Sequence, residues 1–225
     1  MPTKIQLRSE FRKQATGWED PPKGVFQDIP DDIFPAMPNI YRAFSLVRRE
    51  DVRYLVLGQD PYYQPGLDGQ PIATGVAFSV KNLDNVRNKK DASSLQRVLK
   101  GIYGDCKARE TKSSLEDWVK CKGILLLNTA LTVPAPKRGK ALRAAVGCHL
   151  DHWNTFTQYV VRSMPAESVT LVAWGKPAAA LVKLVRPDGN NVLVCNHPVA
   201  SRGKLGSFSK FWSGDGISLK CGCIG

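Results

Sequence analysis

The feature that most constrains the fold of this chain is an alternation of short apolar runs with longer segments of helical periodicity. Four apolar runs have the length and composition of buried strands, and they cover residues 54–57, 124–127, 169–174 and 191–195. Apolar residues at helical spacing predict helices over residues 39–49, 93–103, 115–120, 149–164 and 177–185. This alternation predicts one α/β domain, with a central four-stranded, mostly parallel sheet flanked by helices on both faces.

The composition agrees with a single globular domain. A chain of 225 residues with 43% hydrophobic and 23% charged residues is unlike a disordered, coiled-coil or collagen-like chain. Residues 1–37 are rich in proline and charge, and we expect an irregular arm or an outer layer there, followed by a domain over 38–215 and a tail over 216–225. No apolar run reaches the ~20 residues of a membrane span, and residues 1–13 lack the apolar centre of a secretion signal. We therefore expect a cytoplasmic monomer that does not contact a membrane.

The chain carries a large excess of positive charge, which points to a class of binding partner. The chain has 32 Lys and Arg against 20 Asp and Glu, a formal net charge of +12. Such an excess is typical of proteins that bind nucleic acid, although it also promotes solubility. The six cysteines form no CxxC pair, so we expect reduced thiols rather than disulfides or a metal centre.

Polar side chains follow three of the four predicted strands. Asp60, Asn128 and His197 lie there, and ligands of open parallel sheets bind at the carboxyl ends of the strands. Each residue alone has a common structural role, because Asp starts turns, Asn caps segments and a lone His is usually part of the fold. An acid, an amide and an imidazole at one crevice predict acid–base or electrostatic hydrolysis. The chain lacks the P-loop and GxGxxG patterns of nucleotide binding.

Basic residues adjoin the same strand ends, in three clusters. Cationic loops around a crevice predict contact with a phosphate backbone, rather than a merely solvated surface. The clusters contain Lys81, Arg87, Lys89, Lys90, Lys137, Arg138, Lys140, Arg143, Arg202, Lys204 and Lys210.

Four motifs, in this order and spacing, resemble family 1 uracil-DNA glycosylases. They are GQDPY at 58–62, GVAFSV at 75–80, LLLNT at 125–129 and the His197-Pro198 pair, and the resemblance covers about residues 38–212. It implies a monofunctional DNA-repair hydrolase that takes uracil out of the DNA stack and cleaves its N-glycosidic bond. It also implies that the reaction needs no cofactor or metal. The partners implied are single- or double-stranded DNA containing uracil and a protein inhibitor of such enzymes.

The resemblance implies a role for each matching residue. Asp60 would position the attacking water and stabilise positive charge on the sugar, and His197 would stabilise the departing uracil anion through its O2. The pocket for uracil would be made by four residues, of which Asn128 rejects cytosine and Tyr62 excludes the methyl group of thymine. The implied pocket residues are Gln59, Tyr62, Phe78 and Asn128, and the implied DNA contacts are Tyr63, Ser94, Ser201 and Arg202.

The chain departs from the family pattern at two places. Tyr63 stands where the family commonly has histidine, and no leucine after His197 aligns with the residue that wedges into the DNA stack. We expect Arg202 or a neighbour to fill the vacated stack, or compression of the DNA backbone to replace the wedge. The altered loop is also expected to weaken the grip of protein inhibitors.

Two other functions compete with uracil excision. One is a glycosylase of the same fold with a broader choice of modified or mismatched bases, and the other is a DNA-binding accessory protein with little catalysis. Tyr62 and Asn128 favour uracil, and the presence of Asp60, Asn128 and His197 together argues against a binding-only protein.

Overall fold

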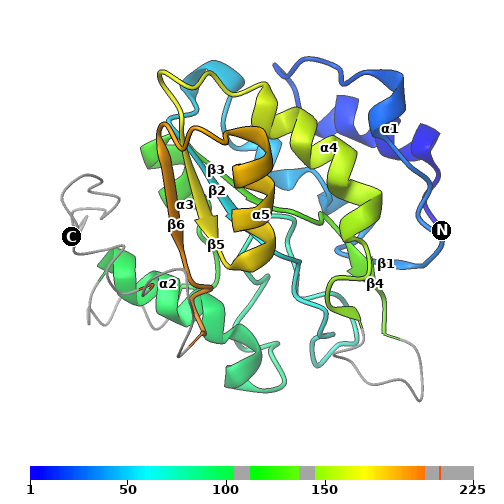
Figure 1. Ribbon diagram of the computed structural model, residues 1–225. Coiled ribbons are helices and arrows are strands. Elements are labelled where there is room, and N and C mark those ends of the chain that lie inside the picture. Colours follow the sequence, from blue (N-terminus) through cyan, green and yellow to red (C-terminus); the bar gives the residue numbers. More distant parts are fainter. Residues whose placement is uncertain (104–111, 137–144, 201–207, 209–225) are drawn as a thin grey trace.

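The centre of the protein is a parallel sheet of four short strands. We analysed a computed structural model, which describes residues 1–103, 112–136, 145–200 and 208. The strands are β2 (Tyr54–Gly58), β3 (Ile124–Asn128), β5 (Thr170–Trp174) and β6 (Val192–Cys195), arranged in the order β3-β2-β5-β6 (Figure 1). All three neighbouring pairs are parallel, so the predicted four-stranded α/β sheet is confirmed.

Helices cover both faces of this sheet. In Figure 1, α4 (Leu150–Arg162) and α5 (Lys176–Val185) lie on one side, whereas α2 (Ser93–Tyr103) and α3 (Glu116–Lys122) lie on the other. The apolar stripes that predicted these helices face inward, and α4 alone buries Trp153, Phe156 and Val160. Right-handed crossovers explain the two layers, because the chain moves one way from β2 to β3 and the opposite way from β3 to β5 and β6.

The helix predicted over residues 39–49 is wrong. The segment instead forms three separate 3₁₀ turns, η2 (Met37–Asn39), η3 (Arg42–Ser45) and η4 (Arg49–Asp51). Side chains from the N-terminal segment take backbone groups that an α-helix would use. Gln14 accepts the N–H of Tyr41, and the Trp18 indole donates to the carbonyl oxygens of Phe44 and Val47, each over 3.1 Å. The regularly spaced apolar residues of this segment are therefore buried without forming an α-helix.

The first residues are more regular than an irregular arm. Helix α1 (Lys4–Gln14) begins with a capping box, in which Thr3 and Gln6 bond each other's backbone. Its Phe11 ring packs edge-on against Tyr41 and Phe44 at centroid distances of 5.2 and 5.4 Å. The proline and charged residues of this stretch mask the helical pattern of α1 in the sequence. The helix packs against one side of the core.

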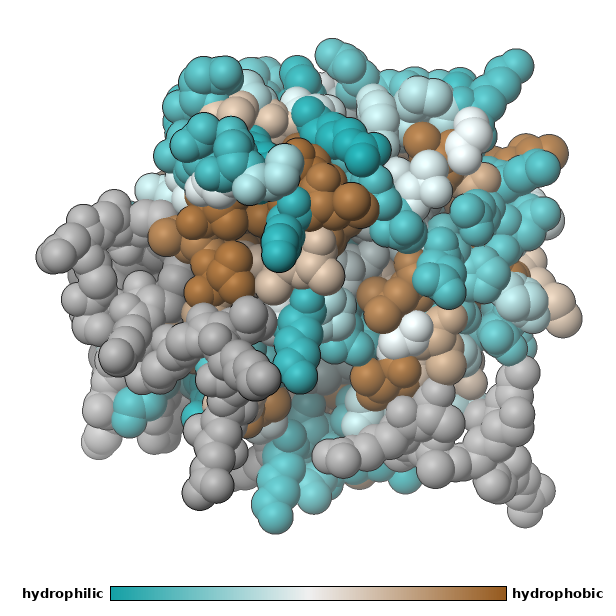
Figure 2. All heavy atoms as spheres, in the orientation of Figure 1, coloured by the Kyte–Doolittle hydropathy of each residue, from teal (hydrophilic) through white to brown (hydrophobic). Residues whose placement is uncertain are grey.

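Smaller elements complete the described fold. A short antiparallel pair, β1 (Ile33–Phe34) with β4 (Val133–Pro134), was not anticipated from the sequence, and neither were the 3₁₀ turns η1 (Lys23–Val25) and η5 (Lys89–Ala92). Apolar residues on the face in Figure 2 gather over α5 and the edge strand β6, where Leu184, Leu193 and Val194 are exposed. None of the described helices combines the length and apolar character that a bilayer crossing requires.

The sheet register brings the strand ends to one edge. Gly58 of β2 lies opposite Asn128 of β3, and Trp174 of β5 lies opposite Cys195 of β6. The residues that directly follow these positions therefore leave the sheet on the same side.

Candidate active site

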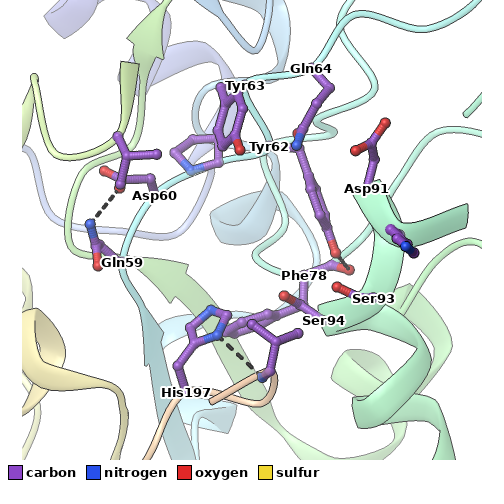
Figure 3. A pocket seen from close by; sticks show the side chains of 14 residues that line it. Gln59, Asp60, Tyr62, Tyr63, Gln64, Phe78, Asp91, Ser93, Ser94 and His197 are labelled. Atoms are coloured by element: carbon purple, nitrogen blue, oxygen red, sulfur yellow. Dashed lines mark hydrogen bonds between the residues drawn. The ribbon is translucent and has the colours of Figure 1, made fainter. Parts of the chain in front are cut away.

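A cavity of about 450 Å³ opens at this edge of the sheet (Figure 3). Five parts of the chain build it: the loop after β2, Phe78, the residues over 90–94 that lead into α2, Val146, and His197 with Val199. Asp60 and His197 enter it from two different sides (Figure 3). The lining residues are Gln59, Asp60, Pro61, Tyr62, Tyr63, Gln64, Phe78, Lys90, Asp91, Ser93, Ser94, Val146, His197 and Val199.

Asp60 is held by two hydrogen bonds on one oxygen. Its Oδ2 accepts the backbone N–H of Gly147 over 3.0 Å and the side-chain amide of Gln59 over 2.8 Å. Its Oδ1 is buried and has no hydrogen-bond partner among the described residues. Burial raises the pKa of Asp60 to about 6, against the lowering effect of Gly147 and Gln59. The group is therefore mostly ionised at neutral pH, and its Oδ1 keeps an unused capacity to accept a hydrogen bond.

His197 presents a neutral imidazole. It follows β6, and its pKa is lowered by burial. The N–H of Val199 points at Nδ1 over 3.4 Å, which favours the tautomer with the proton on Nε2. Gly175 makes room for this residue, because a Cβ there would lie only 3.3 Å from His197 Cβ, and its φ of 104° suits glycine. The ring can thus donate a hydrogen bond without carrying charge.

Tyr62 and Phe78 form an aromatic wall. The Tyr62 hydroxyl donates to the carbonyl oxygen of Phe78 over 3.3 Å and accepts the N–H of Leu95 over 3.2 Å. Phe78 has a φ of 66°, a rare backbone conformation for a bulky residue. Its ring lies 5.9 Å from that of His197 and 5.1 Å from that of Trp174, measured between centroids. The strained backbone of Phe78 thus places its aromatic ring on the wall of the cavity.

Asn128 lies beside the main cavity rather than on its lining. It lines a smaller neighbouring cavity, which shares Pro61, Tyr62 and Phe78 with the larger one. A Cβ at Gly58 would meet Asn128 Oδ1 at 2.5 Å and Phe78 Cζ at 2.8 Å. The side chain of Asn128 therefore sits directly over Gly58, next to the aromatic wall, and is 7% exposed.

The other predicted site residues divide into two groups. Tyr63 and Ser94 line the main cavity, as do Gln59, Tyr62 and Phe78. Ser201 and Arg202 lie outside the described residues, as do the basic residues at 137–144, 204 and 210 and the cysteines at 106, 221 and 223. Of the described basic residues, Lys90 lines the cavity, whereas Arg87 uses its Nε to bond the carbonyl oxygen of Gly66.

Sequence reasoning missed several groups at the cavity. Gly147 acts through its backbone N–H, and no side-chain pattern points to such a donor. Gln64 and Asp91 line the cavity, although neither belongs to a motif used above. Among the described residues, no cluster of three or more His, Cys, Asp or Glu side chains is arranged to hold a metal ion.

The sheet order, the two helical layers and the cavity at the strand ends define an α/β fold that this chain shares with solved structures. Those structures include uracil-DNA glycosylases. The mimivirus uracil-DNA glycosylase is 22% identical, with a TM-score of 0.62 over 80% of this chain and 67% of that one. A variant of the mimivirus protein in complex with UGI is 21% identical, with a TM-score of 0.61 over 82% and 70% of the two chains.

A bacterial structure gives the same result over more of the chain. The UNG of Nitratifractor salsuginis is 19% identical, with a TM-score of 0.53 over 93% of this chain and 89% of that one. No protein-family model matches the sequence. At these identities the likeness establishes the fold, and the chemistry has to be argued from the residues of this chain.

Proposed function

We propose that this protein is a monofunctional uracil-DNA glycosylase of family 1, which hydrolyses the N-glycosidic bond of uracil in DNA and leaves an abasic site. The observation that carries the proposal is that Asp60 and His197 line one cavity, beside the aromatic wall of Tyr62 and Phe78. The fold shared with known uracil-DNA glycosylases supports it.

The two polar groups suit the two charges of the reaction. Breaking the bond between sugar and base leaves positive charge on the sugar and negative charge on the base, and the base must first leave the DNA stack to be reached. Asp60, ionised and with Oδ1 free of partners among the described residues, would position the water and stabilise the sugar cation. His197 Nε2–H would donate to the uracil anion where its charge develops.

The remaining residues suit recognition of a small pyrimidine. Uracil would stack on Phe78, while Tyr62 would occupy the space of a thymine methyl group and Gln59 would line the pocket. Asn128, beside this wall, would pair with the uracil edge and reject cytosine. The bonds from the Tyr62 hydroxyl to Phe78 and Leu95 hold the wall rigid, which such discrimination requires.

DNA contact would come from the cavity rim. Ser94 and Tyr63 would bind phosphates beside the extruded base, and Lys90 adds positive charge there. Ser201 and Arg202 are proposed as further contacts, with Arg202 or a neighbour filling the stack. A mimivirus relative was crystallised with UGI, and an inhibitor of this kind is a proposed partner of this chain as well. We further propose that the protein acts as a monomer, with residues 38–215 forming the glycosylase domain.

Incubation with an oligonucleotide that holds one uracil, followed by alkali, tests the proposal. Strand scission at uracil in the wild type, with free uracil released, is expected. Asp60→Asn and His197→Ala should each lose most of this turnover and keep DNA binding, whereas Asp188→Asn, in an exposed turn, should not change it. Scission at thymine or mismatched bases would favour the broader glycosylase, and DNA binding without scission would favour an accessory protein.

A further inference from the structure

Three buried side chains near the cavity form a hydrogen-bonded chain that the proposed mechanism does not use. The indole Nε1 of Trp153 donates to Thr132 Oγ1 over 2.7 Å, and Thr132 Oγ1 lies 2.9 Å from His149 Nδ1. His149 is 1% exposed and Thr132 is fully buried. An indole N–H can only donate, so Thr132 Oγ1 accepts it and forms a second hydrogen bond with His149 Nδ1.

The two ring nitrogens of His149 have different surroundings. Nδ1 is hydrogen-bonded to Thr132, whereas Nε2 is buried without a hydrogen-bond partner among the described residues and lies 3.7 Å from Asp31 Oδ2. The titratable groups that face the ring are Asp31 and His152, the latter at a centroid distance of 5.7 Å. Burial, followed by the charge of His152, lowers the pKa of His149, and Asp31 opposes this effect. The ring is therefore neutral near pH 7.

His149 also stands at the end of the turn that reaches Asp60. The turn is closed by the N–H of Cys148 on Ala145 O over 3.4 Å and by the N–H of Leu150 on Gly147 O over 3.2 Å. Gly147, with a φ of 78°, lies inside this turn and donates its N–H to Asp60 Oδ2 over 3.0 Å. Only Cys148 separates the anchored histidine from the Gly147 N–H that the carboxylate accepts.

The other end of the chain is tied to the same site. Thr132 belongs to the segment after β3, where Ala130 N–H and the Thr129 hydroxyl each donate to Gln59 O over 2.9 Å. Gln59 is the second donor to Asp60 Oδ2. The contact between Thr132 and His149 therefore joins the turn that contains Gly147 to the segment that hydrogen-bonds the backbone of Gln59.

We propose that His149 is a positioning residue for Asp60: through its hydrogen bond with Thr132, it fixes the turn over 145–149 so that the N–H of Gly147 meets the carboxylate. The role in catalysis rests on the proposed glycosylase function, whereas the effect on Asp60 itself does not. The Gly147 N–H favours the ionised carboxylate, so a loosened turn raises the pKa of Asp60.

Four variants separate this role from simple stabilisation of the fold. His149→Leu removes the ring nitrogen that bonds Thr132, and Thr132→Val removes the hydroxyl but keeps the shape of the side chain. His149→Asn keeps an amide that can hydrogen-bond Thr132 close to the position of Nδ1. The matched control is Thr157→Val, because the Thr157 hydroxyl is also buried in α4 but bonds only to the helix carbonyl oxygens of Trp153 and Asn154.

The direct readout is the pKa of Asp60, from NMR titration of its carboxyl carbon. We expect His149→Leu and Thr132→Val to raise it by about one unit, which corresponds to weakening one hydrogen bond to a charged group. His149→Asn should return it close to the wild-type value. Thr157→Val should leave it unchanged while lowering the melting temperature. The acid limb of the pH–rate profile should move with the NMR value.

The outcomes distinguish this proposal from the proposed function. If Asp60 titrates alike in the wild type, His149→Leu, Thr132→Val and Thr157→Val, the positioning role is wrong, whatever the activity. If the wild type releases no uracil but the Asp60 titration moves as expected, the glycosylase function is wrong and the positioning role holds. Should His149→Leu fail to fold, Thr132→Val and His149→Asn give the same comparison.

Discussion

At the scale of single residues, Asp60 places a carboxylate at a buried position, where the folded state disfavours its negative charge. Burial raises its pKa to about 6, and the two hydrogen bonds on Oδ2 recover only part of the lost hydration. A group whose charge is disfavoured in the folded state lowers stability whenever it is ionised. Such groups are typical of sites kept for chemistry.

Asp60→Asn should therefore stabilise the protein while abolishing turnover. The pKa of Asp60 is raised from 3.8 to about 6, so its penalty is complete above pH 6 and disappears below 3.8. A shift of this size corresponds to roughly 2 to 3 kcal/mol. Urea unfolding of both proteins at pH 7.5 and pH 4 measures the effect. A gain of equal size at both pH values would contradict the explanation.

The same pKa predicts the pH dependence of activity. Below about pH 6 the carboxyl of Asp60 becomes protonated, so it can neither orient water nor stabilise a cation. We expect kcat for uracil release to fall about tenfold per pH unit below this value. The pKa of His197 is lowered by burial, so its protonation comes below its usual range. A single-turnover rate that stays constant from pH 8 to pH 5 would contradict a reaction that needs an ionised Asp60 with a pKa of about 6.

Tyr62 carries the prediction about specificity. Tyr62→Ala should open the wall and admit thymine. The preference for uracil over thymine should fall by about 10- to 100-fold, the discrimination that a pocket usually achieves on one methyl group. Tyr62→Phe is the control, because it keeps the ring and loses only the hydroxyl bonds to Phe78 and Leu95. Release of free thymine from a duplex measures the change. Full rejection of thymine by Tyr62→Ala would place the selective wall elsewhere.

At the scale of elements, the sequence is a good guide where local pattern and tertiary packing agree. The strands β2, β3, β5 and β6 and the helices α2 to α5 were predicted to within about two residues, because each carries its own apolar run or stripe. Residues 39–49 carry a similar stripe, but Gln14 and Trp18 occupy their backbone groups. Hydrogen bonds from residues far away in the sequence, such as Gln14 and Trp18, produce no recognisable pattern within residues 39–49.

The candidate site divides in the same way. Asp60 and His197 could be placed from the sequence because strand ends of a parallel sheet meet at one edge. Asn128 follows the same rule, yet its side chain turns into the smaller cavity over Gly58. The N–H of Gly147 could not be found, since a backbone donor on a turn has no residue type that marks it. Side-chain chemistry is thus readable from sequence, and backbone chemistry at a site is not.

Helix α1 gives a prediction about stability. Phe11 is 2% exposed and packs against Tyr41, Phe44 and Phe156, so Phe11→Ala should cost about 3 to 5 kcal/mol. Ile5, on the same helix, is 76% exposed, and Ile5→Ala should change stability by less than about 0.5 kcal/mol. Chemical unfolding of the two variants tests the difference. Equal stabilities would mean that α1 does not belong to the core.

At the scale of the whole molecule, the net charge of +12 predicts how DNA binding responds to salt. Each phosphate contact releases a counterion, so a site with several contacts should lose roughly a hundredfold in affinity between 50 and 200 mM salt. Titration of labelled single- and double-stranded DNA at several salt concentrations measures the slope. The melting temperature over the same range is the control. An affinity that ignores salt would contradict a role for the basic loops.

The strand order β3-β2-β5-β6 has a consequence for how activity is acquired. Asp60 follows β2 and His197 follows β6, with β5 between them, so the acid and the imidazole meet only after the last strand has joined. A nascent chain that still lacks β6 has Asp60 without His197 beside it. Under the proposed function, such a chain would therefore be inactive until its last strand is in place.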